Sequence, residues 1–109
     1  MSAEFAGSLN QRLELWRLGP DRTAAGLSNH EWEIFGSCLA SVSPEGSGSE
    51  AEGMTLSALA RYRMVIRTRR DVRIEQQVRW RERSYLVRQI IEDPRSPDRM
   101  ELRCEEVRA

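Results

Sequence analysis

Arginine alternates with apolar and aromatic residues in the segment from Arg61 to Arg69. Successive side chains of a β-strand leave opposite faces, so this pattern predicts a strand with one buried face and one basic face. Guanidinium groups form planar, paired hydrogen bonds with carboxylates and phosphates, which suits such a face to an acidic partner. A strand face that simply meets solvent would carry the same pattern, and the sequence leaves both interpretations open. The basic face consists of Arg61, Arg63, Arg67 and Arg69.

Residues that could support catalysis do not form a recognisable motif. The chain has no Gly-x-Ser-x-Gly sequence, no phosphate-binding loop and no cluster of metal ligands. Its one histidine, His30, is followed by Glu31 and Trp32 and is interpreted as a surface residue rather than a general base. Glu105 and Glu106 are adjacent on an expected strand, so their carboxylates would face opposite sides. We expect a protein that is not an enzyme and that holds no cofactor or metal.

The two cysteines, Cys38 and Cys104, each fall in phase with the apolar face of an expected strand. Free thiols that pack as small apolar side chains are favoured over a disulfide in a protein made in the cytosol. Two sulfur atoms and one histidine distant in sequence do not complete a zinc site.

Alternation of apolar and polar residues recurs along the chain and predicts about six strands. Polar turns separate the later strands at residues 81–84 and 93–98, and the second turn contains two prolines, which do not fit a central strand. The expected strands cover residues 12–17, 32–42, 61–69, 72–80, 85–91 and 100–105. Many short strands and few helical residues predict an all-β fold, either a small barrel or a sandwich.

The strand expected at residues 32–42 carries large apolar side chains on both faces. Strict alternation places Trp32 and Ile34 on one face and Phe35 and Leu39 on the other. Trp32 is interpreted as an anchor of the core or of an interface. Gly36, inside the strand, indicates either a β-bulge or a close approach of another group to the backbone.

Residues 43–53 form one low-complexity segment rich in glycine, serine and glutamate. The segment has no large apolar side chain and is predicted to be a flexible loop, because it cannot bury enough surface to become ordered. Residues 54–60 favour helix but are too few for a stable helix alone, so we expect at most a short helical turn. The acidic residues of the loop are Glu45, Glu50 and Glu52.

Length and charge indicate one domain, residues 1–109, with a strong asymmetry between its halves. All 17 basic residues are arginine, and 17 acidic residues balance them to a net charge of zero. Residues 1–60 hold three arginines and eight acidic residues (−5), whereas residues 61–109 hold fourteen and nine (+5). Opposite signs favour contact between copies. No apolar run spans a bilayer and no signal peptide is evident, so we expect synthesis in the cytosol and no membrane contact.

The ordered phrases of the chain resemble those of the phage head–tail joining family, also called head closure or stopper proteins. An aromatic residue is common in that family where Thr68 stands, and a glycine is common in the hairpin turn where this chain has Arg81, Glu82 and Arg83. These departures leave the type of the hairpin turn open. The matching phrases are LNQRL (residues 9–13), IRTRRDV (66–72), VRWRERSYLV (78–87) and LRCEE (102–106).

The resemblance implies a small β-barrel that joins the head and tail of a virion or phage-like particle. In that family a homo-oligomeric ring, of six or twelve copies, docks on the portal-bound adaptor and closes the DNA channel after packaging. The ring then offers a platform for the tail terminator or tail tube protein, and DNA passes through it without sequence-specific binding. Such proteins occur in tailed phages, prophages and gene transfer agents, so the protein would be made in the bacterial cytoplasm and incorporated into the particle.

The resemblance also suggests roles for the charged residues singled out above. The four arginines would lie at an interface between subunits or between rings. The loop with Glu45, Glu50 and Glu52 would lie near the ring axis, where its carboxylates repel DNA phosphates or help to gate the channel. A hairpin loop without such a role is the alternative for this segment.

A small β-barrel that binds nucleic acid is the rival function. The arginine face, with Tyr62, Trp80 and Tyr85 nearby in sequence, contains the ingredients of a surface for single strands. Two observations weigh against this function: the three aromatic residues fall in phase with the buried face, and the net charge is zero.

Overall fold

The computed structural model describes residues 7–19, 31–45 and 60–107. Within these ranges the chain consists of strands and connecting loops, apart from helical backbone at Gly7 and Ser8. No helix in this part of the chain is long and apolar enough to cross a membrane. The strands are β1 (Gln11–Leu18), β2 (Trp32–Pro44), β3 (Arg61–Arg67), β4 (Gln77–Trp80), β5 (Arg83–Ile91) and β6 (Arg99–Glu106). The prediction of an all-β fold with about six strands is confirmed.

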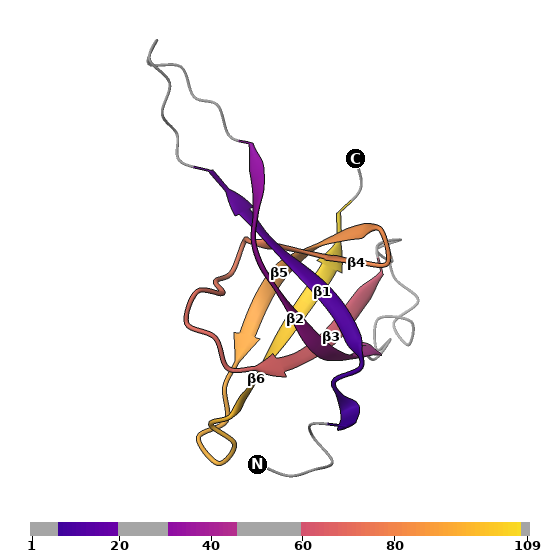
Figure 1. Ribbon diagram of the computed structural model, residues 1–109. Coiled ribbons are helices and arrows are strands. Elements are labelled where there is room, and N and C mark those ends of the chain that lie inside the picture. The colour runs from indigo at the N-terminus through magenta and orange to yellow at the C-terminus, as the bar shows by residue number, and fades with distance from the viewer. Residues whose placement is uncertain (1–6, 20–30, 46–59, 108–109) are drawn as a thin grey trace, which may run out of the picture.

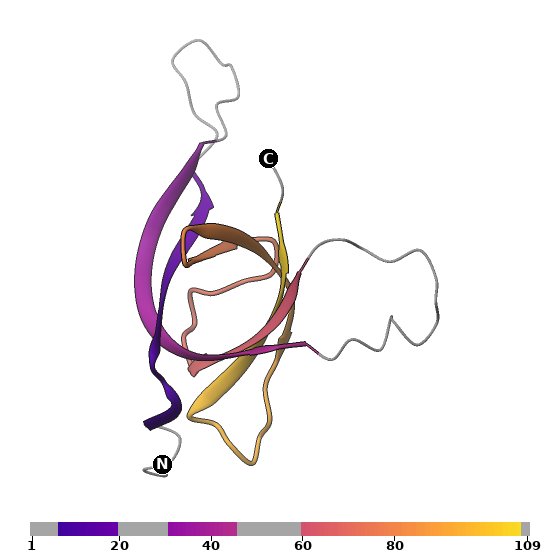
Figure 2. The ribbon, with the colours of Figure 1, turned by 90° about the vertical axis from the view of Figure 1, so that its right-hand side faces the viewer.

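The six strands close into a barrel in the order β1-β2-β3-β6-β5-β4 (Figure 1). Every neighbouring pair is antiparallel. Strand β1 closes the barrel against the short β4 through only three cross-strand pairs, at Glu14, Leu15 and Trp16. Figure 2 shows β2 curving around the barrel, so that its first part pairs with β1 and its last part with β3. Of the two architectures that the sequence allowed, the chain adopts the barrel.

The interior of the barrel is filled by the apolar faces that alternation predicted. Leu13 of β1, Met64 of β3, Val78 of β4 and Leu102 of β6 are completely inaccessible to solvent. Removing apolar surface from water contributes about 25 cal/mol per Å², so these enclosed side chains supply the main favourable term in folding. The core consists of Leu13, Leu15, Ala40, Met64, Ile66, Val72, Val78, Trp80, Tyr85, Val87, Met100, Leu102 and Cys104.

Three aromatic side chains from β3, β4 and β5 meet in the barrel. The ring centroids of Tyr62 and Trp80 are 5.0 Å apart, and those of Tyr62 and Tyr85 are 5.5 Å apart, both with edge-to-face geometry. The indole N–H of Trp80 donates a hydrogen bond of 3.0 Å to the Gln11 side chain. The aromatic residues therefore pack against one another and against the core, as their phase in the sequence predicted.

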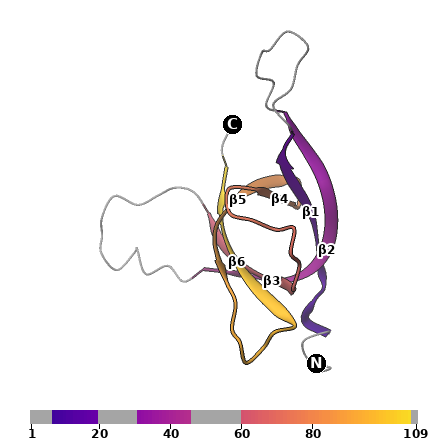
Figure 3. The same ribbon diagram turned by 90° about the vertical axis from the view of Figure 1, so that its left-hand side faces the viewer.

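The connection between β3 and β4 differs from the prediction of a strand over residues 72–80. Only Gln77–Trp80 is strand, and Ile74, assigned to the buried face, is 56% exposed. Strands β3 and β4 are consecutive in sequence but are not neighbours in the barrel, so the chain must pass from one to the other as a loop. Figure 3 shows this loop crossing between β5 and the β1–β2 side. Glu75, with a φ of 72°, turns the chain before β4 begins.

Strand β2 contains a β-bulge that reverses the predicted facing of its first residues. Leu15 pairs with Gly36 but Trp16 pairs with Ile34, so Phe35 is the extra residue. As a result Phe35 packs against the core, whereas Ile34 is 49% exposed. Strict alternation predicted Ile34 on the buried face of the strand and Phe35 on the opposite face, because alternation does not account for the extra residue of a bulge.

The β4–β5 hairpin turns through two residues that lack glycine's conformational freedom. Arg81 and Glu82 have φ values of 54° and 66°, and the pair Trp80–Arg83 flanks them. Positive φ at both central residues defines a type I′ turn, whose twist matches that of the strands. Left-handed backbone costs about 1–2 kcal/mol for a residue with a side chain. The Arg81 guanidinium lies 4.8 Å from the centroid of the Trp80 ring, a favourable contact at the turn.

Both cysteines are free thiols, as predicted. Cys104 is buried in the core, and burial raises the pKa of its thiol to about 12. Cys38 is half-buried, and its pKa is also raised, mainly by burial. His30, residues 46–53 of the expected flexible loop and residues 54–59 of the expected helical turn lie outside the described residues. Residues 43 and 44, assigned to that loop, are instead the end of β2.

Candidate functional site: the arginine face of strands β3 and β6

Strands β3 and β6 present a continuous basic surface on the outside of the barrel. The two strands pair from Arg61–Glu105 to Arg67–Arg99, and their alternate residues, such as Met64 and Leu102, fill the core. The other residues face outward and comprise five arginines, two glutamates and one valine, a formal charge of +3. We call this surface the arginine face; it consists of Arg61, Arg63, Val65 and Arg67 of β3 and Arg99, Glu101, Arg103 and Glu105 of β6.

Like charges stand directly opposite each other at two positions of this face. Arg63 pairs across the strands with Arg103, and Arg67 pairs with Arg99. Like charges in directly opposed positions destabilise a sheet, so the isolated barrel gains nothing from this arrangement. Arg103 is partly neutralised by a hydrogen bond of 2.9 Å to Glu101, whereas Arg63 is exposed and forms no ion pair with the described residues. The arrangement is suited to a carboxylate or another anionic group supplied from outside.

At the Arg61–Glu105 end of the arginine face, arginines and glutamates form a network of ion pairs. Glu105 lies 3.3 Å from Arg61 and 3.9 Å from Arg88, and Glu106 lies 2.9 Å from Arg83. The two neighbouring carboxylates therefore face different partners, as the sequence predicted. These pairs are exposed on the arginine side, so each contributes little to stability, but together they hold the arginines in place.

A second β-bulge adds two polar residues to this end of the face. Val87 pairs with Cys104 and Gln89 pairs with Arg103, so Arg88 is the extra residue in β5. Arg88 and Gln89 are consequently both exposed. They line a groove of about 580 Å³ that also includes Glu45. Its remaining lining residues are Arg61, Arg103, Cys104 and Glu105.

Glu45, assigned by sequence to the channel loop, lies at the end of β2 beside this groove. Its backbone N–H donates a hydrogen bond of 3.0 Å to the carbonyl of Arg61. Glu45 is thus attached to the barrel wall, while Glu50 and Glu52 lie outside the described residues.

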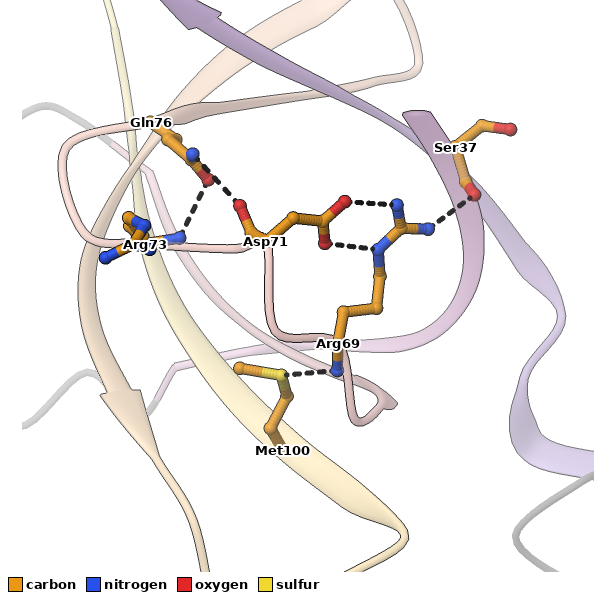
Figure 4. Close-up of polar contacts among 6 residues, drawn as sticks. All are labelled: Ser37, Arg69, Asp71, Arg73, Gln76 and Met100. Atoms are coloured by element: carbon orange, nitrogen blue, oxygen red, sulfur yellow. Dashed lines mark hydrogen bonds and ion pairs between the residues drawn. The ribbon is translucent and has the colours of Figure 1, made fainter. Parts of the chain in front are cut away.

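Arg69 lies beyond the end of β3 and does not belong to the arginine face. Its guanidinium forms two hydrogen bonds with the Asp71 carboxylate, of 2.9 and 2.8 Å, and donates a third of 3.2 Å to the carbonyl of Ser37 (Figure 4). The backbone N–H of Arg69 points at the sulfur of Met100, 3.3 Å away. Hydrogen bonds from Arg69 hold the pKa of Asp71 below its ordinary value. Arg69 therefore fastens the β3–β4 loop to β2.

Gly36 makes room for this guanidinium. A methyl group added at Gly36 would lie 2.7 Å from Nη2 of Arg69, which is closer than non-bonded atoms approach. Gly36 also directly follows the bulged Phe35. The two interpretations of Gly36 that the sequence left open, a bulge and a close approach, are both confirmed.

Sequence reasoning missed the contribution of β6 to the arginine face and the polar residues that β5 adds beside it. The alternation of Tyr85 and Val87 as buried residues continues not at residue 89 but at Ile90, which packs against the core. That spacing of three is the signal of the Arg88 bulge. Arg99 and Arg103 alternate with core residues in the sequence, but only the pairing of β3 with β6 places them beside Arg63 and Arg67.

The described residues contain no group of three or more potential metal ligands. The arginine face presents charged side chains on an open surface and does not form an enclosed pocket. It is therefore a candidate surface for protein association through ion pairs.

Comparison with known proteins gives one family and a shared fold. A family model described as phage head completion protein matches residues 6–107. The structure is similar to the solution structure of protein SF1141 from Shigella flexneri 2a, with a TM-score of 0.75 and 22% identity over 92% of this chain and 94% of that one. It is also similar to a chain in the virion of a native gene transfer agent particle, with a TM-score of 0.66 and 23% identity over 93% and 97%. No curated protein sequence matches significantly.

We predict that Gly36→Ala lowers the free energy of unfolding by about 1–2 kcal/mol, because the added methyl displaces a guanidinium that makes charge-assisted hydrogen bonds. Chemical denaturation followed by tryptophan fluorescence measures the change. Gly7→Ala is the matched control, since nothing lies within 4 Å of a methyl group there. Equal stability of the two variants would contradict the role assigned to Arg69.

Proposed function

This chain belongs to the phage head completion protein family, as the match over residues 6–107 shows, and we propose that it joins the head of a particle to its tail. The resemblance to head–tail joining proteins that the sequence phrases indicated is confirmed by this membership. The protein is accordingly a structural component of a virion or phage-like particle. The family match over nearly the whole chain is the observation that carries the proposal.

The finer role proposed here is closure of the DNA channel by a ring of copies. The ring, of six or twelve copies, would sit between the portal-bound adaptor and the tail terminator or tail tube protein. Contacts between two different faces of the same subunit generate a closed ring when the rotation between neighbours closes. The arginine face has a formal charge of +3, and residues 1–60 carry a net charge of −5, so the chain has regions of opposite sign. This charge asymmetry supports the ring and does not fix its number of copies.

The arginine face is the proposed contact of one subunit with an acidic neighbour. Arg61, Arg63 and Arg67 of the sequence-predicted interface lie on it, and Arg103 extends it onto β6. The fourth predicted residue, Arg69, would act indirectly by holding the adjoining loop. An acidic partner would relieve the repulsion within the pair Arg63–Arg103, so association and local stability would be coupled.

The acidic loop near the channel is retained as a proposal for residues 46–53. Glu50 and Glu52 would keep DNA phosphates away from the ring, because like charges repel at short range. Glu45 is anchored to the barrel, so a deletion that tests the loop should begin after it.

Binding of nucleic acid through stacked bases is disfavoured by the aromatic cluster. Trp80 and Tyr85 are buried, at 8% and 3% exposure, so their ring faces are not available on the surface. DNA would pass through the ring without sequence-specific contacts. Salt-dependent binding of single-stranded DNA by the isolated protein is the result that would favour the nucleic-acid function instead.

We expect a strain that lacks this gene to produce full-size heads that have lost their DNA, beside separate finished tails. The reason is that the portal channel is left open and the tail has no platform. Electron microscopy of the particles, with a complemented strain as control, checks this expectation. Normal tailed particles in the deletion strain would defeat the proposed function.

The double variant Arg63→Glu/Arg103→Glu should fold as the parent does but reduce the yield of joined particles by about tenfold or more. Reversing two charges at a contact costs several kcal/mol, and each 1.4 kcal/mol is about a factor of ten. Circular dichroism checks the fold, and counts of tailed particles check the function. Arg95→Glu, on the β5–β6 turn with a side chain 90% exposed, is the control. Equal yields from both variants would exclude the arginine face from the contact.

Deletion of residues 46–52 should leave the barrel folded but release packaged DNA from otherwise joined particles. The barrel survives because β2 and β3 still pair from Ala40–Ile66 to Pro44–Tyr62. Retained DNA and attached tails in particles with this deletion would rule out a gating role for the loop.

A further inference from the structure

Strands β1 and β2 extend beyond the barrel as a two-stranded arm. Pairing of β1 with β4 ends at Trp16, and pairing of β2 with β3 begins only at Ala40. Beyond those points the two strands pair with each other alone, through Arg17–Glu33 and Leu18–Trp32. Figure 1 shows this end of the hairpin projecting from the barrel. We define the arm as residues 16–18 and 31–35.

The outer face of the arm is apolar and uncovered among the described residues. Leu18 and Trp32 form one cross-strand pair and Trp16 and Ile34 the next, so the four side chains share a face. Arg79 stacks on Trp16, with its guanidinium carbon 3.8 Å from the ring centroid, but Leu18 and Ile34 are 47% and 49% exposed. Adjacent large apolar side chains on a surface mark a site of interaction.

A groove with apolar lining residues lies farther along β2. It is lined by the apolar residues Leu9, Cys38 and Leu39 and by the arginines Arg67 and Arg69. It has a volume of about 300 Å³, and Leu39 is 50% exposed. We call it the Leu39 groove.

The arm and the Leu39 groove are opposite in charge at their margins. The arm carries Glu31, Glu33 and Arg17, a formal charge of −1, with Glu33 paired to Arg17. The groove is lined by Arg67 and Arg69, and Asp71 pairs with Arg69, so its formal charge is +1. Apolar centres surrounded by opposite charges are the features of two surfaces that recognise each other.

One copy cannot join its own arm to its own groove. Ile34 and Leu39 lie on the same strand, five residues apart, and an extended chain holds them roughly 16 Å from each other. A contact between these two surfaces therefore needs a second copy. Because it joins two different surfaces, it repeats from copy to copy and can close into a ring.

We propose that the arm of each copy places Ile34 and Leu18 in the Leu39 groove of the next copy. This contact rests on the proposed ring and names the surfaces that build it. It shares Arg67 with the arginine face, whose other arginines would remain available to the acidic surface of an adaptor or tail protein.

The variant Ile34→Cys tests this contact, because the native Cys38 already lies in the groove. Particles carrying the variant would be treated with a short bis-maleimide at mildly alkaline pH and analysed on a denaturing gel. We expect a ladder of covalently linked copies. Residues 34 and 38 of one chain are separated by roughly 13 Å along the strand, beyond the reach of a short linker. Cys104 is buried and does not compete.

Two matched variants control the experiment. Ile34→Cys/Cys38→Ser removes the receiving thiol and should give unlinked protein. Val107→Cys places a thiol at a site that is 37% exposed and belongs to neither the arm nor the Leu39 groove, and it should also remain unlinked. Leu18→Cys, at the neighbouring position of the arm, should reproduce the ladder and serves as the second arm variant if Ile34→Cys does not enter particles.

The outcomes separate this inference from the proposed function. Arm variants that enter particles and stay unlinked would overturn the contact between arm and groove while leaving the head–tail role intact. Covalent linking that persists in the Ile34→Cys/Cys38→Ser variant would also overturn the contact between arm and groove. Normal tailed particles from the strain that lacks the gene would instead contradict the proposed function, on which the contact rests.

Discussion

The guanidinium of Arg69 connects the parts of this barrel that the order of the strands would otherwise leave apart. Strands β3 and β4 follow each other in sequence but are separated in the barrel, so a loop must cross between them. Arg69 fastens that loop by binding Asp71 within it and the carbonyl of Ser37 on β2. Glycine at position 36 leaves room for the contact, because a methyl group there would lie 2.7 Å from the guanidinium and force it to shift. The position of the loop and the bulge in β2 are thus linked through one side chain.

Two bulges determine what the outside of the barrel can bind. The bulge at Phe35 turns that ring toward the core and exposes Ile34 on the arm. The bulge at Arg88 places two consecutive polar side chains beside the arginine face. An extra residue changes the direction of the side chains on either side of it, and closure of the barrel removes the free strand edges of a sheet. Association must therefore use side-chain faces and the arm, which are the surfaces shaped by these bulges.

The arginine face shows a balance between folding and association. The opposed pairs Arg63–Arg103 and Arg67–Arg99 oppose folding weakly, since exposed charges are screened by water and salt. The enclosed core residues supply far more free energy than that repulsion removes. A stable barrel can therefore present unbalanced positive charge, and a protein that functions by assembly gains binding partners from it.

The sequence by itself determined the all-β class, the inward residues of β1, β3 and β6, the free thiols and the family, because alternation and ordered phrases are local properties of the chain. Tertiary structure alone decided the neighbours of each strand, the loop in place of the expected strand at residues 72–76 and the inward turn of Arg69. Alternation predicts the face of a strand on which each residue lies, but the prediction fails beyond a bulge, because the bulge adds a residue. Pairing between distant strands, which no local pattern encodes, then decides which side chains become neighbours.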